Sequence, residues 1–250
     1  MMAIMQLWKN LEEIVEMEPN PGNSLHHSSH EMTLRMIEMA GSCDPSDGHS
    51  QRVSEYSVEL YQQWAKTRKF PLLEVRKVVE VLRTAALIHD IGMLGVSDVI
   101  RKKLNALTDD EKIAMQAHTI VGVRFFRSTT YFWEYLSAEV ALNHHENWDG
   151  SGYPGHIDNI YASKINIGPG KRGTEIPLSA RLVAIADVYD ALVSPRAYRR
   201  AWRQDHAMSY IRSKAGKKFD PELVGVFLKM GTKLKAIQEK YLYQSKSKGN

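Results

Sequence analysis

Apolar residues recur at helical spacing along almost the whole chain from Glu31 onward. The clearest runs contain Val53, Tyr56, Leu60 and Trp64 in one segment, and Val75, Val78, Val79, Leu82 and Ala86 in the next. Side chains three and four positions apart share one face of a helix, so this spacing predicts helices that each bury one face. Neither a convincing strand alternation nor an internal repeat is found. The chain is therefore predicted to be all-α.

Several helix limits can be placed from local signals. The Thr-Asp-Asp-Glu sequence at 108–111 matches a capping box, which predicts the start of a helix that runs through Val121. Two further helices are expected at 177–193 and 205–215, and a last helix is expected to begin at Pro221.

The N-terminal part has a different pattern. Residues 4–18 carry an apolar helical face, and residues 19–29, which contain two prolines, are expected to form a linker. The face predicts core or bundle packing; a homodimer contact or the end of a signalling helix are the alternatives. Met32, Met36 and Met39 share one helical face, which favours adaptable core packing over a cofactor site.

Length and composition limit the class of protein. With 250 residues, of which 43% are hydrophobic and 25% charged, the chain fits one large globular domain or two small ones. No apolar run is long enough to cross a bilayer, and the acidic N-terminal stretch has no cleavage site of a signal peptide. A single cysteine, Cys43, suits a reducing compartment. We therefore expect a cytoplasmic protein with no membrane partner.

The net charge of +4 is modest. Much of it lies in residues 233–248, which are expected to form a solvated basic tail. An excess this small and scattered is compatible with a phosphate-bearing ligand, but it argues against nucleic acid as a partner.

The run His-His-Glu-Asn-Trp-Asp-Gly-Ser-Gly-Tyr-Pro at 144–154 places two imidazoles where a helix is expected to end in a loop. Neighbouring residues on a helix diverge by about 100°, so His144 and His145 cannot point the same way. They can still reach one metal ion if the helix end faces a cavity, because neutral imidazole is a common metal ligand. Taken alone, the pair favours a solvated surface position.

A long segment with several glycines follows, at 156–175. It is too long for a plain connection in a helical bundle. Loops of this length in compact domains are usually functional lids or disordered insertions. Since it comes directly after the Gly-Tyr-Pro turn, it is a candidate cover for whatever the histidines hold.

Imidazole and carboxylate side chains recur at the ends or on the faces of several predicted helices: His49, His89, Asp90, His118, His144, His145 and Asp187. Helical bundles build metal sites in this way, with ligands that project inward from facing helices. Asp90 and Asp187 are embedded in apolar runs, and buried aspartates are rare unless they are paired or bind metal. Buried, hydrogen-bonded carboxylates are the alternative, and the number of histidines makes it less attractive.

Ligands of this mixed type suit iron, manganese, zinc or nickel. Seven ligands are too many for one ion, but they suffice for two if one carboxylate bridges. Two ions about 3.5–4 Å apart are the usual arrangement for phosphodiester hydrolysis by a metal-bound hydroxide. Asp90 is the candidate bridge, because a short carboxylate can offer one oxygen to each ion.

Arginines follow the Asp187 helix closely. Arginine binds phosphate oxygens through two parallel hydrogen bonds. Arg196 and Arg199 lie nearest to that helix and are the candidate phosphate contacts, with a solvated basic face as the alternative.

Taken together, these motifs resemble the HD-GYP family, bacterial cyclic di-GMP phosphodiesterases of the HD metallohydrolase superfamily. The resemblance rests on His49, on His89-Asp90, on the sequences at 118–122, 144–154 and 185–199, and on Phe219-Asp220-Pro221. It implies an HD-domain helical bundle with a binuclear metal centre at 45–230, between N-terminal helices at 1–44 and a basic helix or tail at 231–250.

The resemblance also implies roles for particular residues. The family's metal ligands match His49, His89, Asp90, His118, His144, His145 and Asp187, and its phosphate-binding residues match Arg196 and Arg199. The Gly-Tyr-Pro turn, with Tyr153, shapes the rim of the site in the family and is implicated in contacts with diguanylate cyclase domains. The substrate implied is cyclic di-GMP, and another cyclic dinucleotide such as cyclic GMP-AMP is the alternative.

This chain departs from the family pattern at two positions. Met93 stands where the family usually has a lysine that points toward the phosphate. Pro45 stands where some members have a glutamate that supports a third metal ion. The loss of the lysine leaves open a weakly active module that senses nucleotide or docks onto a cyclase.

Overall fold

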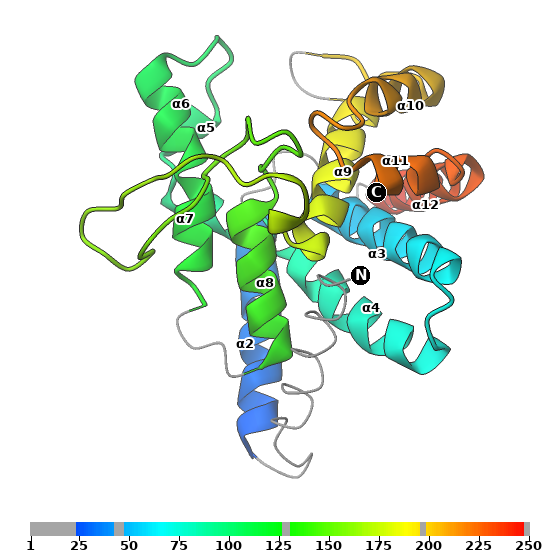
Figure 1. Cartoon of the computed structure of the whole chain (residues 1–250), viewed down its shortest axis with the longest axis horizontal. Helices are drawn as coiled ribbons and strands as arrows, with labels where there is room; N and C mark the ends of the chain where they lie inside the picture. Colours follow the sequence, from blue (N-terminus) through cyan, green and yellow to red (C-terminus); the bar gives the residue numbers. More distant parts are fainter. Residues whose placement is uncertain (1–23, 43–47, 127–130, 196–198, 248–250) are drawn as a thin grey trace.

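The computed structural model describes residues 24–42, 48–126, 131–195 and 199–247 (Figure 1). Its helices are α2 (Ser24–Ser42), α3 (His49–Thr67), α4 (Leu72–Leu87), η1 (Ile91–Gly95), α5 (Asp98–Arg101), α6 (Asp109–Gln116), α7 (His118–Val123), α8 (Phe132–Asn143), η2 (Gly173–Glu175), α9 (Leu178–Val193), α10 (Gln204–Ser213), α11 (Pro221–Phe227) and α12 (Gly231–Ser247). Within these ranges, β pairing is limited to two isolated bridges. The prediction of an all-α fold is confirmed.

The core lies around α3. This helix packs against α4 and α9, and α4 packs in turn against α8 (Figure 1). The predicted stripe on α3 is fully enclosed: Val53, Tyr56 and Leu60 are 0% exposed. Burial of such apolar faces supplies most of the stability of a helical bundle.

The capping box at Thr108 forms as predicted. The Glu111 amide donates to Thr108 Oγ1 over 3.3 Å, and the Thr108 amide donates to Glu111 Oε2 over 2.8 Å. The helix does not continue through Val121, however. It ends at Gln116, and α7 begins at His118 after a break at Ala117. The break places His118 at the start of a helix. The helical spacing of apolar residues continues across the break and therefore does not reveal it.

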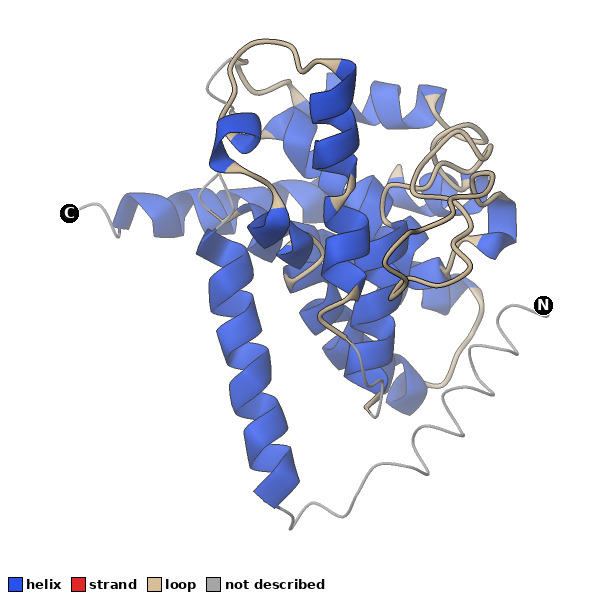
Figure 2. Ribbon diagram, turned by 90° about the vertical axis from the view of Figure 1, so that its left-hand side faces the viewer, coloured by secondary structure: helices blue, strands red, loops and turns tan. Residues whose placement is uncertain are grey.

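The N-terminal expectations are partly corrected. The predicted helix at 4–18 lies outside the described residues, and the predicted linker at 19–29 is helical from Ser24 onward. Of the three stripe methionines, only Met36 is buried; Met32 and Met39 are 55% and 44% exposed. The helix α2 projects away from the core toward its start (Figure 2), and near its end it contacts the core through Met36 and Ala40, while Met39 lies off that face.

The first part of the basic C-terminal segment is a packed helix and not a solvated tail. Leu234 on α12 is fully buried in the main core. The Gln238 amide donates to the Val193 carbonyl over 2.9 Å, and Lys233 forms an ion pair with Glu59 on α3. The boundary predicted at 230 stays a prediction, although α12 shares the core of the preceding helices.

In the described residues, none of the helices combines the length and the apolar character needed to cross a bilayer.

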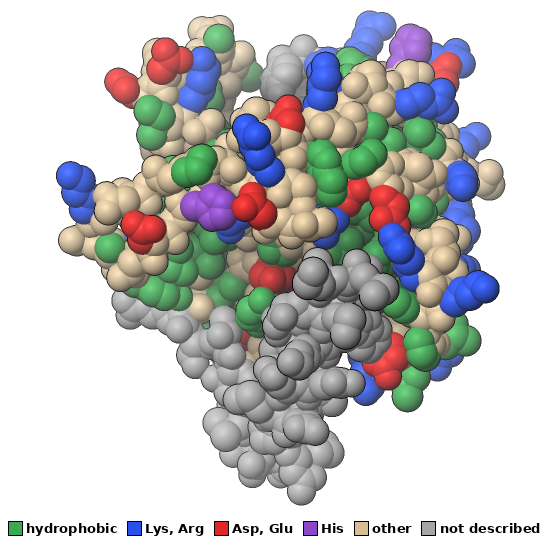
Figure 3. Space-filling model, viewed as in Figure 1, with side chains coloured by type: hydrophobic (Ala, Val, Ile, Leu, Met, Phe, Trp, Pro, Cys, Tyr) green, Lys and Arg blue, Asp and Glu red, His purple; other side chains and the backbone are tan. Residues whose placement is uncertain are grey.

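Charged side chains are mixed on the surface. On the face drawn in Figure 3, the described Lys and Arg side chains are spread among Asp and Glu side chains and do not merge into one basic patch.

The segment η1 approaches α7 closely at Gly92. A Cβ atom at this position would lie 1.9 Å from the His118 carbonyl oxygen and 2.5 Å from the Gly122 amide nitrogen. Both are backbone atoms, so they cannot rotate away. The contact therefore fixes how near Asp90, two residues before Gly92, lies to His118.

Gly92→Ala is expected to destabilise the fold by about 3 kcal/mol, the upper end for overpacking, because α7 would have to shift. Chemical denaturation measures the loss. The matched control is Gly225→Ala on α11, where a Cβ atom would meet no atom within 4 Å. There we expect a change of about 0.5–1 kcal/mol in the stabilising direction. Equal stability of the two variants would contradict the proposed close contact.

Candidate metal centre

Five elements bring the predicted site residues to one place. His49 begins α3, His89 and Asp90 lie between α4 and η1, and His118 begins α7. The other three come from the end of α8 and from the middle of α9: His144, His145 and Asp187. Helix ends and one helix face thus converge, as the pattern of polar positions predicts.

Two groups of these side chains are close enough to hold a metal ion each. Asp90, His118, His144 and His145 form one group, and His49, His89 and Asp90 form the other; ligand atoms within a group lie within 4.8 Å of one another. Asp90 belongs to both groups. Asp187 belongs to neither, but its Oδ1 atom lies 3.4 Å from His49 Nε2.

Four of the imidazoles are fixed through Nδ1. This atom lies 2.8 Å from the Ala86 carbonyl oxygen in His89, 2.8 Å from the Met115 carbonyl oxygen in His118, and 2.9 Å from the Val140 carbonyl oxygen in His144. In His49 it lies 2.8 Å from Asp190 Oδ2. A carbonyl oxygen only accepts, so Nδ1 of the first three must carry the proton. In a neutral ring, the lone pair is then on Nε2, as a metal ligand requires.

The Nε2 atoms face one another across the site. Those of His118 and His144 are 3.4 Å apart, and each lies within 3.4 Å of Asp90 Oδ1. Among the described residues, His89 Nε2 and Asp90 Oδ1 are buried without a hydrogen-bond partner. Buried acceptors are rarely left unpaired. Lone pairs and a carboxylate that point at one another fit a divalent cation, so the donor set agrees with the metal expected from the sequence.

Burial and charge shift the pKa values in the site in opposite directions. Burial lowers the pKa of His89, His118 and His145, which keeps these rings neutral. For Asp90, burial alone would raise the pKa, but the surrounding histidines outweigh it and hold the pKa well below its usual range. The carboxylate is therefore ionised while three of the imidazoles around it are neutral.

Arg52 and Asp190 support His49 and are residues that the sequence analysis missed. Arg52 donates to Asp190 Oδ1 over 2.7 Å and to Asp190 Oδ2 over 3.0 Å. Both side chains are buried. The signal was present in the spacing: Arg52 lies three residues after His49 and Asp190 three residues after Asp187, so each pair shares a helix face. The partner could not be assigned, because the two helices are far apart in sequence.

Glu146 holds the Gly-Tyr-Pro turn in place and was also missed. Its buried carboxylate accepts from the Gly155 amide over 2.6 Å and from the Lys171 amide over 3.2 Å. It thus joins both ends of the long loop to the end of α8. Tyr153 stacks on His145 with ring centroids 4.8 Å apart, so the predicted rim residue lies directly against the predicted ligand.

The long loop at 156–175 is described and makes specific contacts. Its base closes through the His156 amide, which donates to the Pro169 carbonyl, and through the Gly168 amide, which donates to the His156 carbonyl. Arg124, just after α7, donates to the carbonyl oxygens of Ile160 and Ala162, and Figure 1 shows the loop running across α7. A role as a cover stays a prediction.

Comparison with known proteins identifies the family. The family model of the HD domain matches residues 38–223. The chain belongs to the HD domain family. The resemblance to HD-GYP proteins is thereby confirmed at the level of the family.

Curated relatives match most of this HD domain chain. A cyclic di-GMP phosphodiesterase of Vibrio cholerae is 35% identical over 211 residues, which cover 82% of this chain and 40% of the relative. A 3'3'-cGAMP-specific phosphodiesterase 2 of Vibrio cholerae is 30% identical over 190 residues, which cover 76% of this chain and 32% of the relative. The chain thus spans two fifths or less of these two relatives.

A solved structure shows the same fold. Bd1817, described as a HDG"Y"P protein from Bdellovibrio bacteriovorus, is similar with a TM-score of 0.50 and 16% identity over 74% of this chain and 51% of that chain. At this level of identity, the likeness concerns the fold of the HD domain.

Of the two predicted phosphate contacts, only Arg199 lies in the part of the chain that the structure describes. Arg196 lies outside the described residues. Arg199 donates to the carbonyl oxygens of Ala191 and Leu192 near the end of α9, and its guanidinium lies 5.4 Å from the centroid of the Trp202 ring. In this conformation Arg199 caps the helix, and its contact with phosphate stays a prediction.

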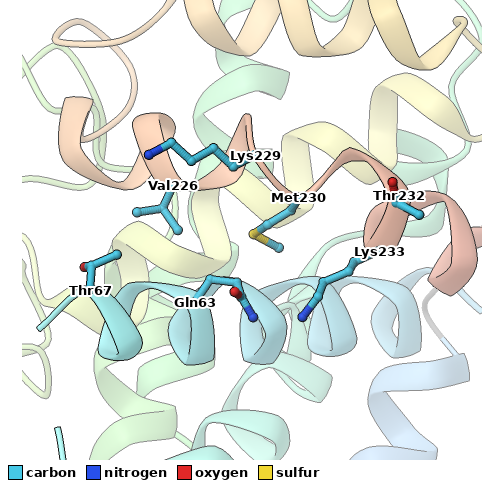
Figure 4. Close-up of a pocket in the computed structure, with 7 residues that line it drawn as sticks. All are labelled: Gln63, Thr67, Val226, Lys229, Met230, Thr232 and Lys233. Atoms are coloured by element: carbon cyan, nitrogen blue, oxygen red, sulfur yellow. The ribbon is translucent and has the colours of Figure 1, made fainter. Parts of the chain in front are cut away.

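A hollow lies between α3 and the C-terminal helices α11 and α12 (Figure 4). It has a volume of about 270 Å³ and is lined by Gln63, Thr67, Val226, Lys229, Met230, Thr232 and Lys233. Gln63 is fourteen residues along α3 from His49, which is about 20 Å. Its lining holds no histidine or carboxylate, so it does not extend the metal centre.

Asp190→Asn is expected to cost about 3 kcal/mol of unfolding free energy, because it leaves Arg52 as an uncompensated buried charge. It should also reduce metal content, since His49 loses the partner that orients it. The matched control is Asp205→Asn, whose exposed pair with Arg203 is expected to contribute little.

The effect of Asp190→Asn should also depend on pH in metal-free protein. Burial alone would raise the pKa of Asp190, but His49 and Arg52 outweigh it and hold the pKa below the ordinary value of 3.8. A depressed carboxyl pKa stabilises the fold above the unfolded pKa, and this contribution is lost as pH falls through the folded pKa. The difference in unfolding free energy between wild type and Asp190→Asn should therefore be largest at about pH 6 and smaller at about pH 3. A difference that grows on acidification would contradict the assignment.

Proposed function

We propose that this HD domain is a metal-dependent phosphodiesterase that hydrolyses cyclic di-GMP. The observation that carries the proposal is the shared position of Asp90, whose carboxylate belongs to both potential ligand groups. Such an arrangement suits two closely spaced ions, which phosphodiester hydrolysis commonly uses. The similarity to a cyclic di-GMP phosphodiesterase over 82% of this chain supports the substrate class.

The proposal assigns two divalent ions to the site. His118, His144 and His145 would hold one, His49, His89 and Asp187 would hold the other, and Asp90 would bridge them. Iron or manganese is favoured, with zinc or nickel as alternatives. When bound, such ions lower the pKa of water and neutralise the charge that grows on the phosphate.

The chain's own residues would hold and orient the reacting groups. Asp90 supplies the negative charge that keeps two cations close together, and the backbone carbonyls at Nδ1 keep the imidazoles aimed at them. Tyr153, stacked on His145, forms an edge beside which the cyclic dinucleotide would lie. Arg196 and Arg199 are the proposed phosphate contacts, and Arg199 would have to leave the carbonyl oxygens that it now binds.

Two other functions remain candidates, each for a specific reason. The similarity to a 3'3'-cGAMP-specific phosphodiesterase favours cyclic GMP-AMP as an alternative substrate. The uncharged, partly buried Met93 favours a weakly active module that senses nucleotide. The finer context is also proposed: a cytoplasmic protein, a diguanylate cyclase docked at the Gly-Tyr-Pro turn, and a homodimer through the N-terminal helix.

A turnover assay on metal-loaded protein tests the proposal. Both cyclic dinucleotides are offered separately and the products are resolved by chromatography. We expect cyclic di-GMP to be opened to the linear dinucleotide faster than cyclic GMP-AMP. The reverse preference would support the second substrate, binding without turnover would support the sensing module, and neither binding nor turnover would contradict all three.

Asp90→Asn should lower turnover by roughly a thousandfold or more, which corresponds to about 4 kcal/mol of activation free energy. The reason is that the neutral amide cannot hold two cations at once. Circular dichroism should show unchanged helicity, since the substitution keeps the size of the side chain. The matched control is Asp98→Asn. Asp98 begins α5 and forms an exposed ion pair with Lys102, so turnover of this variant should stay at the wild-type level.

A further inference from the structure

The turn between α10 and α11 is tied to the loop that leaves the metal centre. The Lys218 carbonyl oxygen accepts from the Trp148 amide over 3.2 Å, and the Lys217 carbonyl oxygen accepts from the Asp149 amide over 2.8 Å. The turn itself is closed by the Gly216 amide, which donates to the Phe219 carbonyl over 2.8 Å. The backbone of Lys218 therefore has a fixed position next to the segment that carries His144 and His145.

Lys218 lies beside the part of α9 that precedes Asp187. It lines a small cavity together with Glu146, Trp148 and Ala184, and Ala184 lies one helical turn before Asp187 on α9. Burial lowers the pKa of Lys218, while the negative charge of Asp187 acts in the opposite direction. The ammonium group is thus half-buried and within electrostatic reach of a predicted ligand.

Within the described residues, no hydrogen bond or ion pair engages Lys218 Nζ, whereas other cations around it are engaged. Lys171 donates to Asn143 Oδ1 over 2.6 Å, and Arg181 donates to Asp220 Oδ2 over 2.5 Å. Lys214 lies over the ring of Tyr210. The ammonium group of Lys218 is only half-buried, so it is accessible to an anionic ligand.

We propose that Lys218 Nζ contacts a phosphate oxygen of the substrate at the Asp187 edge of the metal centre. The identity of that substrate rests on the function proposed above, but an anion subsite at Lys218 does not. An ammonium group is a compact charge with three rotatable donors, so it can follow a phosphate oxygen as the charge on it grows. Lys218 would thus act from beside the N-terminal half of α9, whereas Arg199 follows the C-terminus of that helix.

The test compares Lys218→Met with Lys217→Met in metal-loaded protein. Methionine keeps an unbranched stem and removes the charge, and Lys217 is the exposed neighbour in the same turn. Calorimetry measures the affinity for inorganic phosphate, and elemental analysis measures metal content. We expect Lys218→Met to weaken phosphate binding about tenfold or more, the size of a lost charge-assisted hydrogen bond. Lys217→Met should leave it unchanged, and Lys218→Arg should restore most of it.

Turnover of cyclic di-GMP is then measured on the same variants. A loss of kcat/KM in Lys218→Met that parallels the loss of phosphate affinity supports both the subsite and the function. Lys218→Met could bind phosphate more weakly while wild type hydrolyses neither cyclic dinucleotide. This outcome would support the subsite and contradict the proposed function. Unchanged phosphate affinity in Lys218→Met, no phosphate binding by wild type, or a loss of metal in Lys218→Met alone would overturn the subsite.

Discussion

The carboxylate of Asp90 is the constraint on which the rest of the site depends. It lies between two sets of imidazoles, and one of its oxygen atoms is buried without a hydrogen-bond partner among the described residues. An ionised carboxylate in such a place costs several kcal/mol unless cations compensate it. The surrounding architecture serves this need, because α3, α4, α7, α8 and α9 all direct polar side chains toward the same point.

Each of these imidazoles is oriented by a particular hydrogen-bond partner. Backbone carbonyls at helix ends set the tautomers of His89, His118 and His144, so secondary structure itself aims the Nε2 atoms. Arg52 and Asp190 do the same for His49 from within the core. Such preorganisation lowers the cost of binding a cation, since few side chains must be reordered when it arrives.

Much of this could be predicted from residue types and spacing. Asp90 and Asp187 stand in apolar runs, and this placement is enough to indicate a polar centre inside a helical bundle. The pairing of Arg52 with Asp190 could not be predicted, because it depends on how α3 and α9 are placed, and the same holds for Lys218. The break at Ala117 was not predicted because the helical spacing of apolar residues continues across it. The packing of α12 was not predicted because the many charged residues of this helix indicated a solvated segment, although Leu234 is buried.

The central claim is that one carboxylate serves two ions, and the stoichiometry of metal binding tests it most directly. Elemental analysis of protein purified without chelator and reconstituted with manganese should give two ions per chain. His118→Gln and His49→Gln each remove a ligand from one group only, so each should retain about one ion, in keeping with two groups that share Asp90. A wild-type ratio of one or three, or no metal after reconstitution, would contradict this account.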